Sequence, residues 1–125
     1  MKRRDAREHA LRVLFQLDHS EMDVHEAMAH VTEEKDVFFE QLVQGTMEKR
    51  EEIDGSLNEK LENWSLARLP KIERTILRMA VYEILFGEDA PRPVVLNEAI
   101  ELTKAYGDEQ SSRFVNGVLS KYLND

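Results

Sequence analysis

Apolar residues recur along the chain at intervals of three and four, which is the spacing of one face of an α-helix and not of a β-strand. A first helix is predicted over 4–18, where the apolar face consists of Ala6, Ala10, Val13, Leu14 and Leu17. A short helix follows over 23–32. A third, longer helix is predicted from Asp36, its N-cap, to Trp64, its last apolar position, with a bend or break at Gly55.

Proline and glycine mark the ends of predicted helices in the second half of the chain. Pro70 begins a helix predicted over 70–86, and apolar residues occupy most of its circumference, so it is expected to be the most buried element. Two more helices are predicted, one over 94–106 that is closed by Gly107 and one over 109–123.

These elements predict an all-α fold of six to seven helices in a single domain spanning residues 1–125. The helices are expected to form two small packed bundles, of residues 1–64 and 70–125, that meet along the helix over 70–86. Because the chain has no repeat of fixed period and no low-complexity linker, the two bundles should share one core.

The composition excludes several classes of protein. The 125 residues contain no cysteine, which rules out a disulfide scaffold, thiolate zinc sites and thiol catalysis. No apolar run approaches the roughly 20 residues that a membrane-spanning helix needs. The first residues lack the apolar core of a signal peptide, so a cytoplasmic protein is expected.

Charge is distributed unevenly along the chain. Residues 1–12 carry five lysine and arginine side chains against two acidic ones, although the whole chain has a net charge of −8. A small basic patch on an acidic body is expected where one surface meets a polyanion. A frayed, solvated N-terminus is the alternative interpretation.

The first helix has a second stripe beside its apolar face, formed by Arg4, Arg7, Leu11 and Phe15. Guanidinium groups beside an aromatic ring suit a single-stranded nucleic acid, because phosphates meet the charge and bases stack on the ring. The alternative is that Leu11 and Phe15 only widen the apolar face and pack against another helix.

A second basic–aromatic pair, Arg113 and Phe114, lies on the last predicted helix. If the ends of the first and last helices lie together, the two sets form one RNA-binding surface. About three phosphate contacts and one or two stacked bases give only a modest affinity for RNA. A protein partner that extends this surface is therefore expected.

Signals for catalysis and for metal binding are weak. His25 and His30 are five residues apart, about 140° around a helix, whereas the zinc-protease pattern needs four residues. No glycine-rich phosphate loop occurs, and Gly117 is expected at a close helix–helix contact. We therefore expect no metal, no cofactor and no enzymatic activity.

Glu83 is the one carboxylate on an apolar face, that of the helix over 70–86. Burying a carboxylate is costly unless it is paired or protonated. Glu83 is expected to be a hydrogen-bonded core residue that holds two helices in register. The alternative, a catalytic acid, would need a second titratable group nearby.

Four segments of the chain carry a more specific signal. They are Arg3-Arg4-x-x-Arg7-Glu8 leading into Ala10-Leu11, Ile72-Glu73-Arg74-x-Ile76-Leu77-Arg78-x-Ala80-x-Tyr82-Glu83, Val94-x-x-Asn97-Glu98-Ala99-Ile100-Glu101-Leu102-x-Lys104, and Phe114-Val115-Asn116-Gly117-Val118-Leu119. Together, and over nearly the whole chain, they resemble the NusB transcription antitermination factor family. The resemblance implies an all-helical fold of two small bundles. It also implies binding to the boxA element of nascent ribosomal RNA (rRNA) together with NusE, a small-subunit ribosomal protein.

In this family the complex joins other Nus factors, keeps RNA polymerase elongating through rRNA operons and assists rRNA maturation. The resemblance implies RNA-contacting residues at Arg3, Arg4, Arg7, Phe15, Arg113 and Phe114. It implies NusE-contacting residues at Glu73, Arg74 and Leu77. A NusB-like domain also begins certain rRNA cytosine methyltransferases, but because the sequence ends at Asp125 without an S-adenosylmethionine domain, that activity is not expected.

Two alternative functions remain. One is a protein-only helical adaptor whose basic N-terminal helix docks an acidic partner, and which would not prefer boxA over a scrambled RNA. The other is an enzyme built around Glu83.

Overall fold

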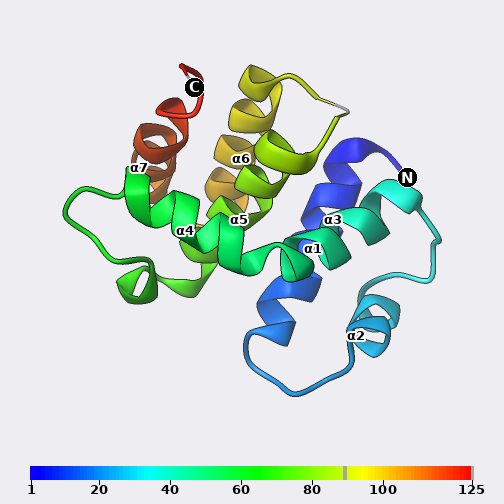
Figure 1. Cartoon of the computed structure of the whole chain (residues 1–125). Coiled ribbons are helices and arrows are strands. Elements are labelled where there is room, and N and C mark those ends of the chain that lie inside the picture. The colour runs from blue at the N-terminus through cyan, green and yellow to red at the C-terminus, as the bar shows by residue number, and fades with distance from the viewer. Residues whose placement is uncertain (89, 125) are drawn as a thin grey trace.

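The computed structural model describes residues 1–88 and 90–124, and in these residues all regular secondary structure is helical (Figure 1). The helices are α1 (Arg3–Leu17), α2 (Val24–Val31), α3 (Val37–Glu48), α4 (Arg50–Lys60), the short 3-10 helix η1 (Leu66–Arg68), α5 (Lys71–Phe86), α6 (Arg92–Tyr106) and α7 (Glu109–Ser120). The predicted all-α fold is confirmed. None of these helices is both long and apolar enough to cross a membrane.

Aspartate side chains begin three of the helices. The Asp36 carboxylate accepts a hydrogen bond of 2.9 Å from the Phe39 backbone N–H, which confirms it as the N-cap of α3. Asp23 caps α2 in the same way, and Asp108 caps α7 by accepting a bond of 2.7 Å from the Ser111 N–H. These caps satisfy backbone donors that the first turn of a helix leaves unpaired.

The third helix predicted over 36–64 is wrong in the position of its break and in its end. The break is at Lys49, where the backbone leaves the helical region with φ −95° and ψ 12° and divides the segment into α3 and α4. Gly55, where the bend or break was predicted, lies inside α4. On the two sides of Lys49 the packing differs, since α3 contacts both α1 and α5, whereas α4 contacts α5 and η1. Trp64, expected in the apolar face, lies beyond the end of α4 with 57% of its surface exposed.

Helix α5 is the central element, as the sequence predicted. It contacts α1, α3 and α4 on one side and α6 and α7 on the other. In Figure 1 α3 and α4 run across the view, α1 and α2 lie to the right, and α6 and α7 lie to the upper left. The side chains of Ile76, Leu77 and Val81 are wholly buried, so the core of the molecule is continuous through α5.

Candidate nucleic-acid interface

Arg7 of α1 lies in the core of the molecule. Its guanidinium donates two hydrogen bonds of 2.8 Å to the Glu83 carboxylate of α5, and both side chains are more than nine-tenths buried. Burial by itself would lower the pKa of Arg7, but the hydrogen bond and the negative charge of Glu83 outweigh it, and the pKa is raised. The pair is therefore ionic.

This pair settles two expectations. The prediction that Glu83 is a hydrogen-bonded core residue joining two helices is confirmed, and its partner is Arg7. The prediction that Arg7 lies in an exposed stripe beside the core is wrong, because Arg7 is buried, and for Leu11 the alternative that it widens the apolar face is confirmed. Helix α1 contacts α2, α3 and α5, and these neighbours cover more of its circumference than its apolar residues alone indicate.

Arg4 lies one turn before Arg7 and keeps 63% of its side chain exposed. Its guanidinium donates two hydrogen bonds of 3.1 Å to the carboxylate of Glu98 on α6. The hydrogen bond to Glu98, followed by the charge of Glu98, raises the pKa of Arg4. Arg3 lies nearby with its guanidinium 4.1 Å from the centre of the Phe38 ring. Two cationic groups thus remain at the surface at the start of α1.

The second half of α1 runs beside the end of α6. Arg12 donates a hydrogen bond of 3.2 Å to the Tyr106 hydroxyl. Arg12 lies eight residues after Arg4 on α1, and Tyr106 lies eight residues after Glu98, the partner of Arg4, on α6. The two helices therefore run side by side in the same direction. Phe15 is half-buried, and its ring centre lies 4.4 Å from that of His19.

The second basic–aromatic pair lies near the start of α7. The Arg113 side chain is 72% exposed, and its guanidinium is 3.8 Å from the carboxylate of Glu109. Phe114 is half-buried and meets Trp64 edge to face, with 6.0 Å between the ring centres. Asp108 precedes this turn, and the backbone N–H of Ser111, followed by its side chain, lowers the pKa of that carboxyl group.

The two sets of predicted RNA-binding residues do not form one compact patch. Arg7 is bonded to Glu83, whereas Ser111 of α7 donates a hydrogen bond of 2.5 Å to Glu73. Glu73 and Glu83 are ten residues apart on α5, which corresponds to about 15 Å along the helix. The start of α7 follows the end of α6, where Tyr106 meets Arg12, whereas Arg4 meets Glu98 eight residues earlier on α6. The arginines at the start of α1 therefore lie away from Arg113 and Phe114.

The residues expected to meet NusE differ in exposure. Glu73 is held by Ser111, and Arg74 donates a hydrogen bond of 3.1 Å to the Asp18 carboxylate at the end of α1. Both are partly exposed at the start of α5. Leu77 is wholly buried with 0% exposure, so its expected place on a surface is corrected: α1, α3, α4, α6 and α7 surround α5 beyond its first turn.

Sequence reasoning missed three participants in this region: Glu98, Tyr106 and Trp64. The spacing of residues on α1 gives no information on which helix covers it, so the partners of Arg4 and Arg12 could not be found. Trp64 was assigned to a helix that ends four residues earlier. Within the described residues, no three His, Asp or Glu side chains are grouped in a way that could hold a metal ion.

Residues 4–124 match the model of the NusB family. The transcription antitermination protein NusB of Lysinibacillus sphaericus (strain C3-41) is 61% identical over 123 residues, which cover 98% of this chain and 97% of that protein. The NusB of Bacillus subtilis (strain 168) is 49% identical over 127 residues, covering 100% and 97%.

Two solved structures are similar over the whole chain. T. maritima NusB is 34% identical with a TM-score of 0.90, covering 100% of this chain and 92% of that one. A chain in a crystal structure of the antitermination factors NusB and NusE in complex with double-stranded RNA is 32% identical with a TM-score of 0.87. That match covers 98% of this chain and 96% of the other.

Proposed function

The chain belongs to the NusB family of transcription antitermination proteins, and we propose that it binds the boxA element of nascent ribosomal RNA together with NusE. In this role it supports processive transcription of rRNA operons and rRNA maturation, and it works in the cytoplasm. The expectation that the chain is not an enzyme is confirmed, because the relatives that it matches over their full length are transcription antitermination proteins. The observation that carries the proposal is the full-length similarity to a NusB solved with NusE and RNA.

The RNA would follow an extended surface instead of a compact patch. We call this surface, from the start of α1 to the start of α7, the RNA track. We assign its phosphate contacts to Arg3 and Arg4 at one end and to Arg113 at the other. Phe15 and Phe114 offer ring surface for bases, since both are only partly buried. Stacking on such rings tolerates any base and contributes about 1–3 kcal/mol per base. Single-stranded RNA can span the track because its backbone is flexible.

Arg7 lies in the core beneath this surface and holds α1 in place. Its buried bond with Glu83 fixes the first half of α1 against α5, and so fixes the direction in which Arg4 leaves the helix. We therefore give Arg7 a positioning role, with Arg4 as the arginine that meets RNA.

The NusE surface would adjoin the α7 end of the track. Glu73 and Arg74 are partly exposed at the start of α5, and the hydrogen bond from Ser111 to Glu73 joins this point to the first turn of α7. RNA held by Phe114 and NusE held by Glu73 would thus be neighbours. Two modest contacts that act together raise the affinity of the complex without any new contact, because the second becomes intramolecular.

We also propose that residues 1–125 work as a single domain. Helix α5 belongs to the core of both bundles, of residues 1–64 and 70–125, because it contacts α1, α3 and α4 as well as α6 and α7. A partner that moves one bundle would therefore move the other.

The proposal is tested by titrating the protein into labelled boxA RNA and into a scrambled RNA, with and without NusE, at two salt concentrations. We expect a preference for boxA, tighter binding with NusE, and about twentyfold weaker binding after a fourfold rise in salt, as for three phosphate contacts. Equal affinity for both RNAs in every condition would instead favour the protein-only adaptor.

A further inference from the structure

Gly117 has no packing role within its surroundings. A Cβ atom placed there would meet no atom of another element within 4 Å. The close helix–helix contact expected at this position is therefore wrong. Glycine is among the least favourable residues inside a helix, yet Gly117 lies in the interior of α7. The missing side chain leaves the backbone of α7 at Gly117 open to close approach from outside the chain.

Gly117 lines a cavity of about 300 Å³ between the end of α4 and α7. The other lining residues include Trp64, Phe114, Arg113 and Lys121. The exposed Trp64 and the half-buried Phe114 meet edge to face, so ring surface remains open to the cavity. Its volume is at the lower end of the range of about 300–1,000 Å³ that is usual for small-ligand sites.

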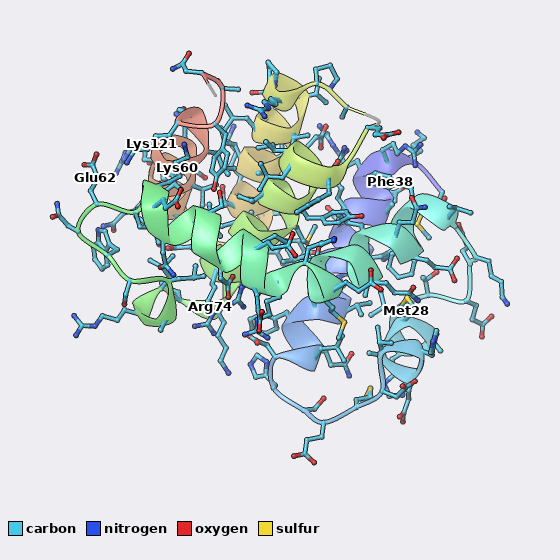
Figure 2. The ribbon with its side chains drawn as sticks, viewed as in Figure 1. Met28, Phe38, Lys60, Glu62, Arg74 and Lys121 are labelled. Carbon is cyan, nitrogen blue, oxygen red and sulfur yellow. The ribbon has the colours of Figure 1, made fainter. Side chains whose placement is uncertain are left out.

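Cationic side chains surround this cavity. The Lys121 ammonium donates a hydrogen bond of 2.6 Å to the Lys60 carbonyl oxygen and lies 3.3 Å from the Glu62 carboxylate. Figure 2 shows Lys60, Glu62 and Lys121 together at one edge of the molecule, where the end of α4 meets α7. Lys60 and Arg113 also line the cavity, so that three cationic side chains face one lining carboxylate, that of Glu62, and the carboxylate partner of Arg113, Glu109, is itself 88% exposed. The set favours an anionic ligand with a flat aromatic part.

We propose that this cavity is a nucleotide subsite, in which one unpaired base stacks against Trp64 while its backbone passes over Gly117 toward Arg113 and Lys121. The subsite rests on the proposed function, because it extends the RNA track past Phe114, which forms one of its walls. Aromatic surface beside cations is the combination that holds single strands through base stacking and phosphate contacts. An apolar segment of a protein partner would use the rings but would have no use for three cations.

The test uses Trp64, which is the only tryptophan in the chain, as its own reporter. Single-stranded boxA RNA is titrated into the full chain, with and without NusE, while tryptophan fluorescence and the anisotropy of a labelled RNA are recorded. We expect saturable quenching with the same midpoint as the anisotropy change. Trp64→Ala should weaken binding about 5- to 150-fold, the equivalent of one stacked base.

Gly117→Ala is the sharper variant, and Gly55→Ala is its matched control. Both glycines lie inside helices, and a Cβ atom at either meets open space, but only Gly117 lines the cavity. Both substitutions should leave the fold intact. Gly117→Ala should weaken RNA binding about fivefold or more, as expected when a methyl group disturbs one stacked base, and should reduce the quenching. Gly55→Ala should change neither.

Three outcomes would overturn the subsite. If RNA binds by anisotropy while Trp64 fluorescence and the Gly117→Ala affinity stay unchanged, the RNA passes elsewhere and the proposed function stands without this site. If NusE alone changes the fluorescence and RNA does not, the cavity is a protein-docking site. If no RNA binds in any condition, the proposed function fails, and the subsite fails with it.

Discussion

The guanidinium of Arg7 and the carboxylate of Glu83 are joined by two hydrogen bonds of 2.8 Å, although 76 residues separate them in the chain. The pair links the first helix of the molecule to its central one. Breaking a buried ion pair by removing one partner is costly, because the other charge stays buried without compensation.

Glu83→Gln should therefore destabilise the protein by about 3–5 kcal/mol. The free energy of unfolding from urea titration measures this change. The double variant Arg7→Met/Glu83→Leu removes both charges and should recover much of the loss. A Glu83→Gln variant as stable as the unchanged chain would contradict the ionic character of the pair.

Arg4 and Arg7 should respond differently to substitution, although they are one helical turn apart. Arg4→Ala should weaken boxA binding and reduce the magnitude of the salt slope by about 0.7, the amount expected for one phosphate on a single strand. It should leave stability nearly unchanged, because the Arg4 side chain is exposed. Arg7→Ala should instead lower the free energy of unfolding. Fluorescence anisotropy at several salt concentrations, together with urea unfolding of each variant, separates the two effects.

Glu98 competes with RNA for Arg4, since its carboxylate occupies two of the guanidinium donors. Glu98→Gln should therefore tighten boxA binding in the same anisotropy assay. Weaker binding would show instead that Glu98 holds Arg4 in the orientation that RNA needs.

Gly45 faces the ring of Tyr82, and a Cβ atom at Gly45 would overlap that ring. Gly45→Ala should push Tyr82 into the adjoining cavity of about 420 Å³ between α3 and α5. Overpacking of this kind costs about 1–3 kcal/mol. Gly55→Ala, where a Cβ meets open space, should raise stability by up to about 1 kcal/mol. Urea unfolding of both variants is the measurement, and equal effects would refute the packing argument.

Asp108 makes the stability of the protein depend on pH in the acid range, through the N-cap of α7. Its pKa is lowered in the folded protein, first by the Ser111 backbone N–H, so its contribution to stability is present above the unperturbed value of 3.8. That contribution is lost as the pH falls through the lower, folded-state pKa. Asp108→Asn keeps a good N-cap but no titrating charge. Its free energy of unfolding should therefore fall less steeply in acid than that of the unchanged chain.

Glu73 can be tested for direct contact with NusE by comparing two variants, one of its charge and one of its hydrogen bond. Glu73→Gln removes the charge but keeps an oxygen that accepts from Ser111, whereas Ser111→Ala removes the donor and keeps the carboxylate. We expect weaker NusE binding for Glu73→Gln and nearly unchanged binding for Ser111→Ala, measured by calorimetry. A loss for Ser111→Ala with unchanged binding for Glu73→Gln would show that the hydrogen bond matters and the charge does not.

Local patterns predicted the helices well because helix formation depends on neighbouring residues. The central position of α5 followed from apolar residues around its circumference, and Asp36 was recognised from its capping chemistry. The break at Lys49 was missed because it depends on which helices α3 and α4 pack against. The bend or break was predicted at position 55 instead, because a glycine lies there.

The candidate site was harder to predict than the fold. Helical spacing places Arg7 relative to the axis of α1 but does not show which element covers it, so its burial against Glu83 was not foreseen. Leu77 was misplaced for the same reason. The chemical type of the surface, arginines with aromatic rings, came from the sequence, whereas its extended shape depends on the parallel course of α1 and α6.

The position of α5 in the core of both bundles also affects folding during synthesis. During synthesis α1, α3 and α4 emerge before the helix that completes their core, and Arg7 remains without its counter-charge until Glu83 has been translated. The contacts of α1 with α2 and α3 can form earlier, but the core of the N-terminal bundle is complete only when α5 has been translated.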